Sequence, residues 1–253
     1  MNNTISKFLA RHIVNIISSI GIGLTSKSEL RRLRHQSELF PEEIVRNLVA
    51  GSRGVLHVGA HTGQEADQYF ILGVNVVWIE ANPLSHEGLL QNIAKYPAQR
   101  AILALVGSVQ GKVVDFHISS NDGLSSSLFR FGHKSGFPQL SMTRSLPLTI
   151  NRLDNLLSSQ EAQGLTHWVL DVQGAELLVL EGAGDLLDYC FSLQVEVSLR
   201  EVYSGGATWN EVNSFLMKRG FTAVLHPAPN SHQNVIFIRS RLNERSQFSS
   251  ESQ

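Results

Sequence analysis

A glycine turn followed by an acidic residue gives this chain the spacing of a nucleoside-binding site. The apolar run Val55–Val58 leads into a turn with Gly59 at its start and Gly63 at its end, after which a helix is expected. Glycines in such a turn let a ligand approach the backbone closely and leave the N–H groups at the start of the helix free to donate hydrogen bonds. A second apolar run ends at Glu80, about twenty residues beyond the glycines, where a carboxylate can accept hydrogen bonds from both hydroxyls of a ribose. The spacing therefore predicts a nucleoside ligand.

The number of glycines in the turn indicates which nucleoside cofactor is bound. Nicotinamide dinucleotides are usually held by Gly-x-Gly-x-x-Gly, whose second glycine lies opposite the pyrophosphate. This chain has Gly59-Ala60-His61-Thr62-Gly63 instead. Because S-adenosylmethionine has no pyrophosphate, the looser turn favours a methyl donor over a hydride carrier. The predicted cofactor contacts are Gly59, Ala60, His61, Gly63, Glu80, Ala81, Asn82 and Val106.

The elements that must position these residues alternate between strand and helix from Gly54 onward, which is typical of βαβ units and a mainly parallel sheet. The expected strands are Val55–Val58, Asn75–Ile79, Ala101–Val106, Lys112–Ile118, Thr166–Leu170, Ser192–Val197, Thr222–His226 and Asn234–Arg239. The expected helices are Gly63–Leu72, Pro83–Lys95, Ala175–Glu181 and Trp209–Arg219, the last ended by Gly220. The segment from Ser119 to Pro147 shows neither period, and a loop of this length inside a compact domain is usually functional.

Length and composition indicate one sizeable α/β domain. The chain has 253 residues, of which 42% are hydrophobic and 17% charged, so it can bury a core of its own. We expect a helical N-terminal extension over residues 1–50, a catalytic domain over residues 51–240 and a disordered tail over residues 241–253. The formal charge of −1 argues against nucleic acid as a partner. The single cysteine, Cys190, excludes an intramolecular disulfide and favours a cytoplasmic location.

The N-terminal residues have the pattern of an amphipathic helix. Apolar residues recur at three- and four-residue intervals between Ile5 and Leu24. The run is interrupted by Asn15 and Ser18, and it is shorter than the roughly 20 apolar residues that a membrane span requires. Such a helix can pack against its own domain or a partner subunit. Weak association with a membrane surface is the alternative.

Several motifs, in order along the chain, resemble the FkbM family of S-adenosylmethionine-dependent methyltransferases between Gly54 and Arg239. They are His57-Val58-Gly59-Ala60-His61-Thr62-Gly63-Gln64-Glu65, Trp78-Ile79-Glu80-Ala81-Asn82-Pro83, Leu153-Asp154, and Leu170-Asp171-Val172-Gln173-Gly174-Ala175-Glu176, with Asn121–Leu128 and Gly132-His133 resembling one subgroup. The resemblance implies a Rossmann-like three-layer α/β fold with a mainly parallel seven-stranded sheet and one antiparallel strand. It also implies S-adenosyl-L-methionine as the cofactor and O-methylation of a hydroxyl on a sugar, glycan or natural product.

Two positions depart from the family pattern. Val106-Gly107-Ser108 stands where an acidic residue often holds the adenine amine, so the adenine contact is left open. Gln173 stands where many members have an acidic residue, although glutamine also occurs there.

Methyl transfer to a hydroxyl requires a group that removes the hydroxyl proton. Asp171 follows a short apolar strand and is expected at the carboxyl edge of the sheet, where open α/β folds bind their ligands. We predict Asp171 or His133 as the base and Glu196 as the residue that binds the acceptor. No His and carboxylate spacing is typical of a metal site, so no metal is predicted, with a Mg²⁺ site at Asp171 and Glu196 as the alternative. Glu176 could either cap its helix or contact the cofactor.

Two other function classes remain as alternatives. An N-methyltransferase acting on nucleic acid or a small molecule commonly has an Asp/Asn-Pro-Pro-aromatic turn after the fourth strand, but this chain has Asp171-Val172-Gln173-Gly174 there. A non-catalytic module would bind the cofactor without turnover, and the presence of both Asp171 and Glu80 argues against it. The sequence leaves the acceptor and the oligomeric state open.

Overall fold

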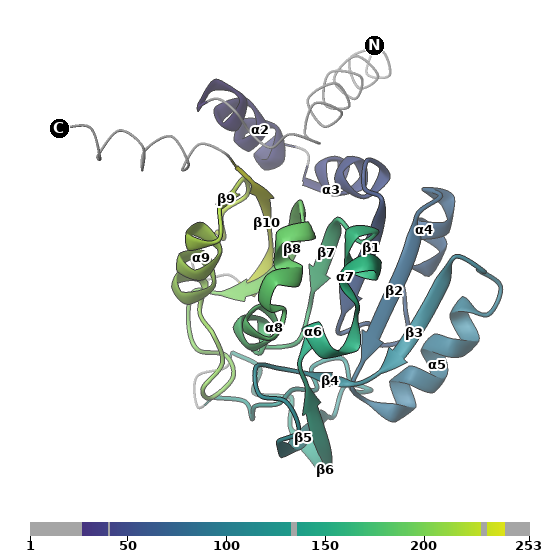
Figure 1. Cartoon of the computed structure of the whole chain (residues 1–253). Coiled ribbons are helices and arrows are strands. Elements are labelled where there is room, and N and C mark those ends of the chain that lie inside the picture. The colour runs from purple at the N-terminus through teal and green to yellow at the C-terminus, as the bar shows by residue number, and fades with distance from the viewer. Residues whose placement is uncertain (1–26, 40, 133–135, 229–231, 241–253) are drawn as a thin grey trace.

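The computed structural model of the chain describes residues 27–39, 41–132, 136–228 and 232–240. The predicted N-terminal helix, the candidate base His133 and the predicted tail of residues 241–253 lie outside the described residues. In the described part of the chain, helices cover both faces of a seven-stranded sheet, and a three-stranded sheet lies beside one end of its strands (Figure 1).

The larger sheet is mainly parallel, as predicted. Its strands are, in spatial order, β3 (Gln99–Leu103), β2 (Asn75–Glu80), β1 (Gly54–Val58), β7 (His167–Leu170), β8 (Ser192–Ser198), β10 (His232–Arg239) and β9 (Phe221–Ala223). Neighbours from β3 to β8 are parallel, whereas β10 is antiparallel to both β8 and β9. The predicted Rossmann-like fold, with an antiparallel strand near the end of the sheet, is therefore confirmed. Because β1, β2 and β7 are parallel neighbours, Gly59, Glu80 and Asp171 meet at the same edge of the sheet.

The central strands are buried on both faces, which explains their continuous apolar sequences. β1 and β7 are buried along their whole length. Alternate side chains point to opposite faces, so Trp78 packs in one core and Trp168 in the other. Helices α3 (Pro41–Ala50), α4 (Ala66–Ile71) and α5 (Pro83–Ile93) contribute to the Trp78 core. The Trp168 core is built with α6 (Leu153–Leu156), α7 (Ser159–Gln163), α8 (Glu176–Gly182), the 3-10 helix η2 (Gly184–Tyr189) and α9 (Trp209–Lys218).

The helix α2 (Lys27–Leu39) and the N-terminal part of α3 form a third, smaller core at the β10 side of the sheet. Leu33 of α2 and Ile44 of α3 pack with Ile236 and Ile238 of β10. Arg34 fixes α2 further, because its Nε donates a hydrogen bond of 3.1 Å to the carbonyl of Ala223. No helix among the described residues has both the length and the apolar character needed to cross a membrane.

The three-stranded sheet differs from the prediction. The expected strand Ala101–Val106 is two strands, because the chain turns at Ala104 and β4 (Leu105–Val106) leaves the larger sheet to pair with β6 (Met142–Asn151). β6 also pairs with β5 (Val113–Ser119), so a ten-residue strand begins at Met142, inside the segment from Ser119 to Pro147 that was expected to be a loop.

β6 could not be recognised because of its composition and its Pro147. Only Leu146, Leu148 and Ile150 alternate with polar or exposed residues, and the first four residues of the strand show no apolar alternation. Proline normally argues against a central strand. Here Pro147 pairs with Asp115 of β5 on one side only, since β4 reaches no further than Ile150 and Asn151.

Two buried histidines are expected to reduce the stability of the fold in acid. The ring of His57 stacks on Trp78, with 4.8 Å between ring centroids, and its Nδ1 lies 3.2 Å from the hydroxyl of Tyr69. Burial lowers the pKa of His57 to about 3, with a smaller contribution from His167, whose own pKa burial lowers to about 4. An unfolded histidine titrates at about 6.5. Between these values the unfolded chain binds protons that the folded chain does not, so the free energy of unfolding falls as the pH falls.

Substituting His57→Phe tests this expectation. The variant should lose part of the pH dependence of unfolding between about pH 4 and 6.5, by up to roughly 1.4 kcal/mol per pH unit. Burial raises the pKa of Glu80 and Glu176, so these two groups make the free energy of unfolding rise as the pH falls. Their contribution is the same in the wild type and in the variant. Urea denaturation of both proteins at several pH values gives the slope of the free energy of unfolding against pH. The difference between the two slopes is due to His57, and equal slopes would contradict the assignment.

Candidate active site

The glycine turn after β1 is closed by its contact with the end of β7. Gly59 has a φ of 85°, and a Cβ at this position would lie 1.8 Å from the carbonyl oxygen of Asp171. Gly63 has a φ of 73°, and its Cβ would lie 2.6 Å from Cδ1 of Leu89. Gly59 requires glycine because backbone occupies the space, whereas at Gly63 the positive φ disfavours other residues and the end of the Leu89 side chain would have to move. The helix after the turn begins only at Ala66, three residues later than predicted, since Gly63 starts a turn first.

Glu80 joins the glycine turn to the start of α5. Its Oε2 accepts a hydrogen bond from the backbone N–H of His61, and its Oε1 accepts one from the N–H of Asn82, both at 2.7 Å. The residue is only 7% exposed, and burial raises the pKa of its carboxyl although these backbone N–H groups oppose the shift. A carboxylate can accept about four hydrogen bonds. Glu80 therefore keeps acceptor capacity for the two hydroxyls of a ribose.

Other predicted cofactor contacts support this arrangement without lining the cavity. Asn82 is buried and caps α5, with its Oδ1 accepting a hydrogen bond of 3.2 Å from the N–H of Leu84. Ala60 packs in the Trp78 core, and Gly63 contacts α5 as described above. Of the eight predicted contacts, Gly59, His61, Glu80, Ala81 and Val106 line the cavity.

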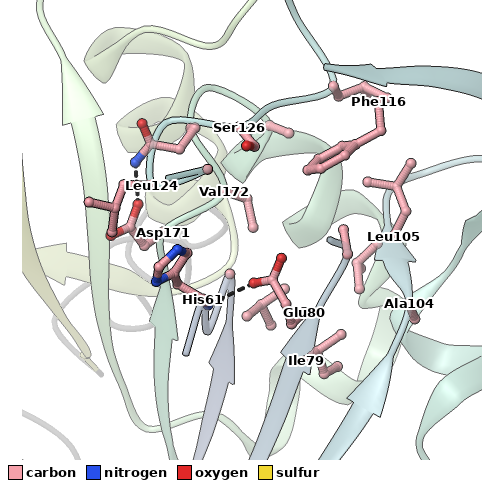
Figure 2. Close-up of a pocket in the computed structure, with 18 residues that line it drawn as sticks. His61, Ile79, Glu80, Ala104, Leu105, Phe116, Leu124, Ser126, Asp171 and Val172 are labelled. Carbon is pink, nitrogen blue, oxygen red and sulfur yellow. Dashed lines mark hydrogen bonds between the residues drawn. The ribbon is translucent and has the colours of Figure 1, made fainter. Parts of the chain in front are cut away.

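The cavity at this edge of the sheet has an apolar end and a polar end, with Glu80 between them (Figure 2). Leu105 and Phe116 lie at the apolar end, on strands of the smaller sheet. Asp171 lies at the other end. Gln173, which also lines the cavity, is hydrogen-bonded to Asp171. Phe116 was missed by sequence reasoning because the smaller sheet was not predicted.

The segment from Asn121 to Leu128 forms one wall of the cavity. Asp122 and Gly123 adopt the left-handed conformation, with φ of 56° and 85°. The imidazole Nε2 of His61 donates a hydrogen bond of 3.0 Å to the carbonyl of Asp122. The hydroxyl of Ser127 donates one of 2.7 Å to the carbonyl of Gln173. These contacts attach the segment to both the glycine turn and the turn after β7, so the serine-rich motif has a structural role in the site.

The polar end of the cavity continues into a cluster that links three strands. Nε2 of Gln173 donates hydrogen bonds of 2.5 Å to Oδ1 of Asp171 and to Oε2 of Glu196. Oε1 of Gln173 accepts a hydrogen bond from the hydroxyl of Tyr203. Oε1 of Glu196 lies 3.1 Å from Nε2 of His232. The predicted residues Asp171 and Glu196 are thus brought together by Gln173, which the sequence analysis noted only as a departure from the family pattern. Tyr203 and His232 are additions that the sequence did not indicate.

Burial and repulsion between carboxyl groups change the acidity of this cluster. Burial, followed by the charge of Glu196, raises the pKa of Asp171 well above its usual range. Burial also raises the pKa of Glu176 to about 7. Oε1 of Glu176 accepts hydrogen bonds from the N–H groups of Val172 and Gly174, at 3.2 and 3.1 Å. Glu176 therefore holds the turn after β7 in place. Asp171 lines the cavity with a carboxyl group whose pKa is raised, so it is an unusually weak acid.

The arrangement gives no support to a Mg²⁺ site at Asp171 and Glu196. Nε2 of Gln173 donates into the space between the two carboxylates, and an N–H donor does not share such a position with a cation. Among the described residues, no group of three or more His, Cys, Asp or Glu is placed to hold a metal ion.

The cavity extends past Glu80, with an apolar surface on one side and the carboxyl group of Asp171 on the other. This site on this fold defines the class of S-adenosylmethionine-dependent methyltransferases, with S-adenosylmethionine as the cofactor. The chain belongs to the FkbM methyltransferase family, because the model of the methyltransferase FkbM domain matches residues 57–223.

Comparison with known proteins gives relatives of low identity. The 2-O-methyltransferase NoeI of Sinorhizobium fredii (strain NBRC 101917 / NGR234) is 24% identical over 160 residues, which are 60% of this chain and 65% of that protein. A magnesium protoporphyrin IX methyltransferase from Synechocystis PCC 6803, solved with bound S-adenosylmethionine, is 11% identical with a TM-score of 0.44, over 83% of this chain and 81% of that one. A structure described as a putative caffeoyl-CoA O-methyltransferase from Staphylococcus aureus is 13% identical with a TM-score of 0.44, over 83% and 92% of the two chains.

Proposed function

We propose that this methyltransferase acts on a hydroxyl group of a sugar, glycan or natural-product acceptor. The observation that supports it is the pair of carboxyl groups, Asp171 and Glu196, held by one amide at the polar end of the cavity. A hydroxyl must lose its proton as it is methylated, and a carboxylate within hydrogen-bond reach can take that proton. The name of NoeI, a 2-O-methyltransferase, also favours an oxygen acceptor.

The roles of the residues follow from their places around the cavity. S-adenosylmethionine, when bound, supplies a methyl group on a sulfonium centre. Glu80 would hold the ribose, and the apolar end near Phe116 would hold the adenine. Asp171 lines the cavity at its polar end, and Glu196 is linked to it through the amide of Gln173. An acceptor hydroxyl bound next to Gln173 would meet both carboxyl groups. Alignment of the acceptor by this pair supplies the orientation that an in-line displacement requires.

Transfer of a labelled methyl group tests the proposal. The purified protein would be incubated with S-adenosylmethionine carrying a ¹³C-methyl group and a panel of oligosaccharides, nucleotide sugars, phenols and amines. We expect the label in a methyl ether, which its NMR shift distinguishes from an N-methyl group or an ester. Label found only on nitrogen would favour the N-methyltransferase alternative. Cofactor binding without transfer to any panel member would favour a non-catalytic module.

A further inference from the structure

The two oxygens of the Glu196 carboxylate face different partners. Oε2 accepts the hydrogen bond from Gln173, and Oε1 faces Nε2 of His232 at 3.1 Å. The other ring nitrogen of His232, Nδ1, is hydrogen-bonded to the hydroxyl of Ser198. Both side chains are largely covered, with exposed fractions of 15% for Glu196 and 22% for His232. The imidazole is therefore fixed on both sides and points one nitrogen at the carboxylate.

Asp171 and Glu196 are too close to be ionised together easily. Each accepts a 2.5 Å hydrogen bond from the same nitrogen of Gln173, so the two accepting oxygens are at most about 5 Å apart. Two carboxylates at this separation in a buried site repel each other, and such pairs retain one proton. The question for catalysis is which of the two carries the negative charge.

The groups around His232 are mainly acidic. Glu196 faces it from β8, and the carboxyl groups of Glu176 and Asp171 and the phenol of Tyr203 lie around Glu196. Burial lowers the pKa of His232, but the hydrogen bond and charge of Glu196, with a contribution from Glu176, outweigh burial and raise it overall. The side chain of Asp171, by contrast, contacts the neutral amide of Gln173 and the carboxyl group of Glu196, and neither of these partners is a cation.

We infer that His232 is a positioning residue that holds the negative charge of the pair on Glu196, so that Glu196 is the base and Asp171 keeps its proton. This inference rests on the proposed function. In the transfer step the acceptor's O–H bond breaks and its proton moves to the Glu196 carboxylate. The oxygen forms a bond to the methyl carbon, and the electron pair of the broken S–CH₃ bond stays on sulfur. The assignment reverses the roles that the sequence suggested for Asp171 and Glu196.

A pair of isosteric variants distinguishes the two carboxyl groups. Glu196→Gln removes the base, and loss of a general base typically lowers kcat by about 100-fold or more. Asp171→Asn keeps a neutral donor of the same shape as the protonated acid, so we expect kcat to fall by about tenfold or less. The opposite ranking, with Asp171→Asn the more damaging change, would overturn the inference and leave the proposed O-methylation standing.

The role of His232 is tested by His232→Gln and by NMR titration. Without the imidazolium the pair shares its proton more evenly, so the acidic limb of the kcat profile should move to higher pH while affinity for S-adenosylmethionine is retained. In protein labelled at histidine, the pKa of His232 should fall when Glu196 is replaced by glutamine. An unmoved acidic limb, or a His232 titration unaffected by Glu196→Gln, would overturn the inference. Because the titration needs no acceptor, it remains informative even if no methyl transfer is found.

Discussion

Replacing Glu80 with glutamine is expected to weaken S-adenosylmethionine binding by about 100-fold or more. The change removes a charged acceptor for the ribose hydroxyls and turns an NH₂ group toward the backbone N–H of either His61 or Asn82. A hydrogen bond to a charged group is worth roughly 1.5–3 kcal/mol, and two ribose hydroxyls lose their charged acceptor. The unpaired backbone N–H is present with and without the ligand, so it lowers the stability of the variant and not its affinity. About 3 kcal/mol in total corresponds to this loss in affinity.

Equilibrium dialysis with labelled S-adenosylmethionine measures the effect. Glu87→Gln is the matched control, because it makes the same chemical change at an exposed position of α5. The control should bind like the wild type. If Glu80→Gln also retained wild-type affinity while remaining folded, the ribose would have to be held elsewhere.

Substituting alanine for Gly59 is expected to destabilise the fold by about 3 kcal/mol or more. The new Cβ would lie 1.8 Å from the carbonyl oxygen of Asp171, which is backbone and cannot rotate away. The positive φ of Gly59 adds strain for any residue with a side chain. The strands β1 and β7 must therefore separate at their carboxyl ends, and overpacking and backbone strain each cost roughly 1–3 kcal/mol.

Gly73→Ala separates the two contributions. Gly73 has a similar φ of 70°, but a Cβ there would meet nothing within 4 Å. This control should lose only about 1–2 kcal/mol from the left-handed conformation. Urea denaturation of both variants gives the comparison, and equal losses would mean that the contact with Asp171 is unimportant.

The positions of Gly59, Glu80 and Asp171 could be predicted because each of them lies at or next to the end of an apolar strand. β1 and β2 are continuous apolar runs, and Gly59 and Glu80 follow from where those runs end. The same reasoning located Asp171 after β7. Parallel pairing then brings the three together without any knowledge of side-chain packing.

The part of the site around Glu196, Tyr203 and His232, where we place the acceptor, could not be predicted. It depends on the register of the antiparallel strands β8 and β10 and on loops. His232 pairs with Ser198 and Asn234 with Glu196, so a shift of one residue in β10 would turn His232 to the other face. The residues near His232 show little apolar pattern, since β10 becomes buried only from Val235 onward. One signal was available: Glu196 and Ser198 alternate with Val195 and Val197, which marks a polar face on β8.

The wall of the cavity was also beyond sequence reasoning. The strand that contains Phe116 was predicted as Lys112–Ile118, but its partner β6 carries Pro147 and many exposed residues and was not recognised. Without β6, the place of Phe116 in a separate sheet beside the cavity could not be predicted. The serine-rich segment was recognised as a motif, but its attachment to His61 and Gln173 depends on contacts across 61 and 46 residues of sequence.

Titration calorimetry of the full chain with S-adenosylhomocysteine measures the central claim most directly. The cavity across Glu80 predicts saturable binding of one molecule per chain. A correctly folded wild-type protein that releases or absorbs no heat with this ligand or with S-adenosylmethionine, over concentrations up to the millimolar range, would contradict the cofactor site and every role derived from it.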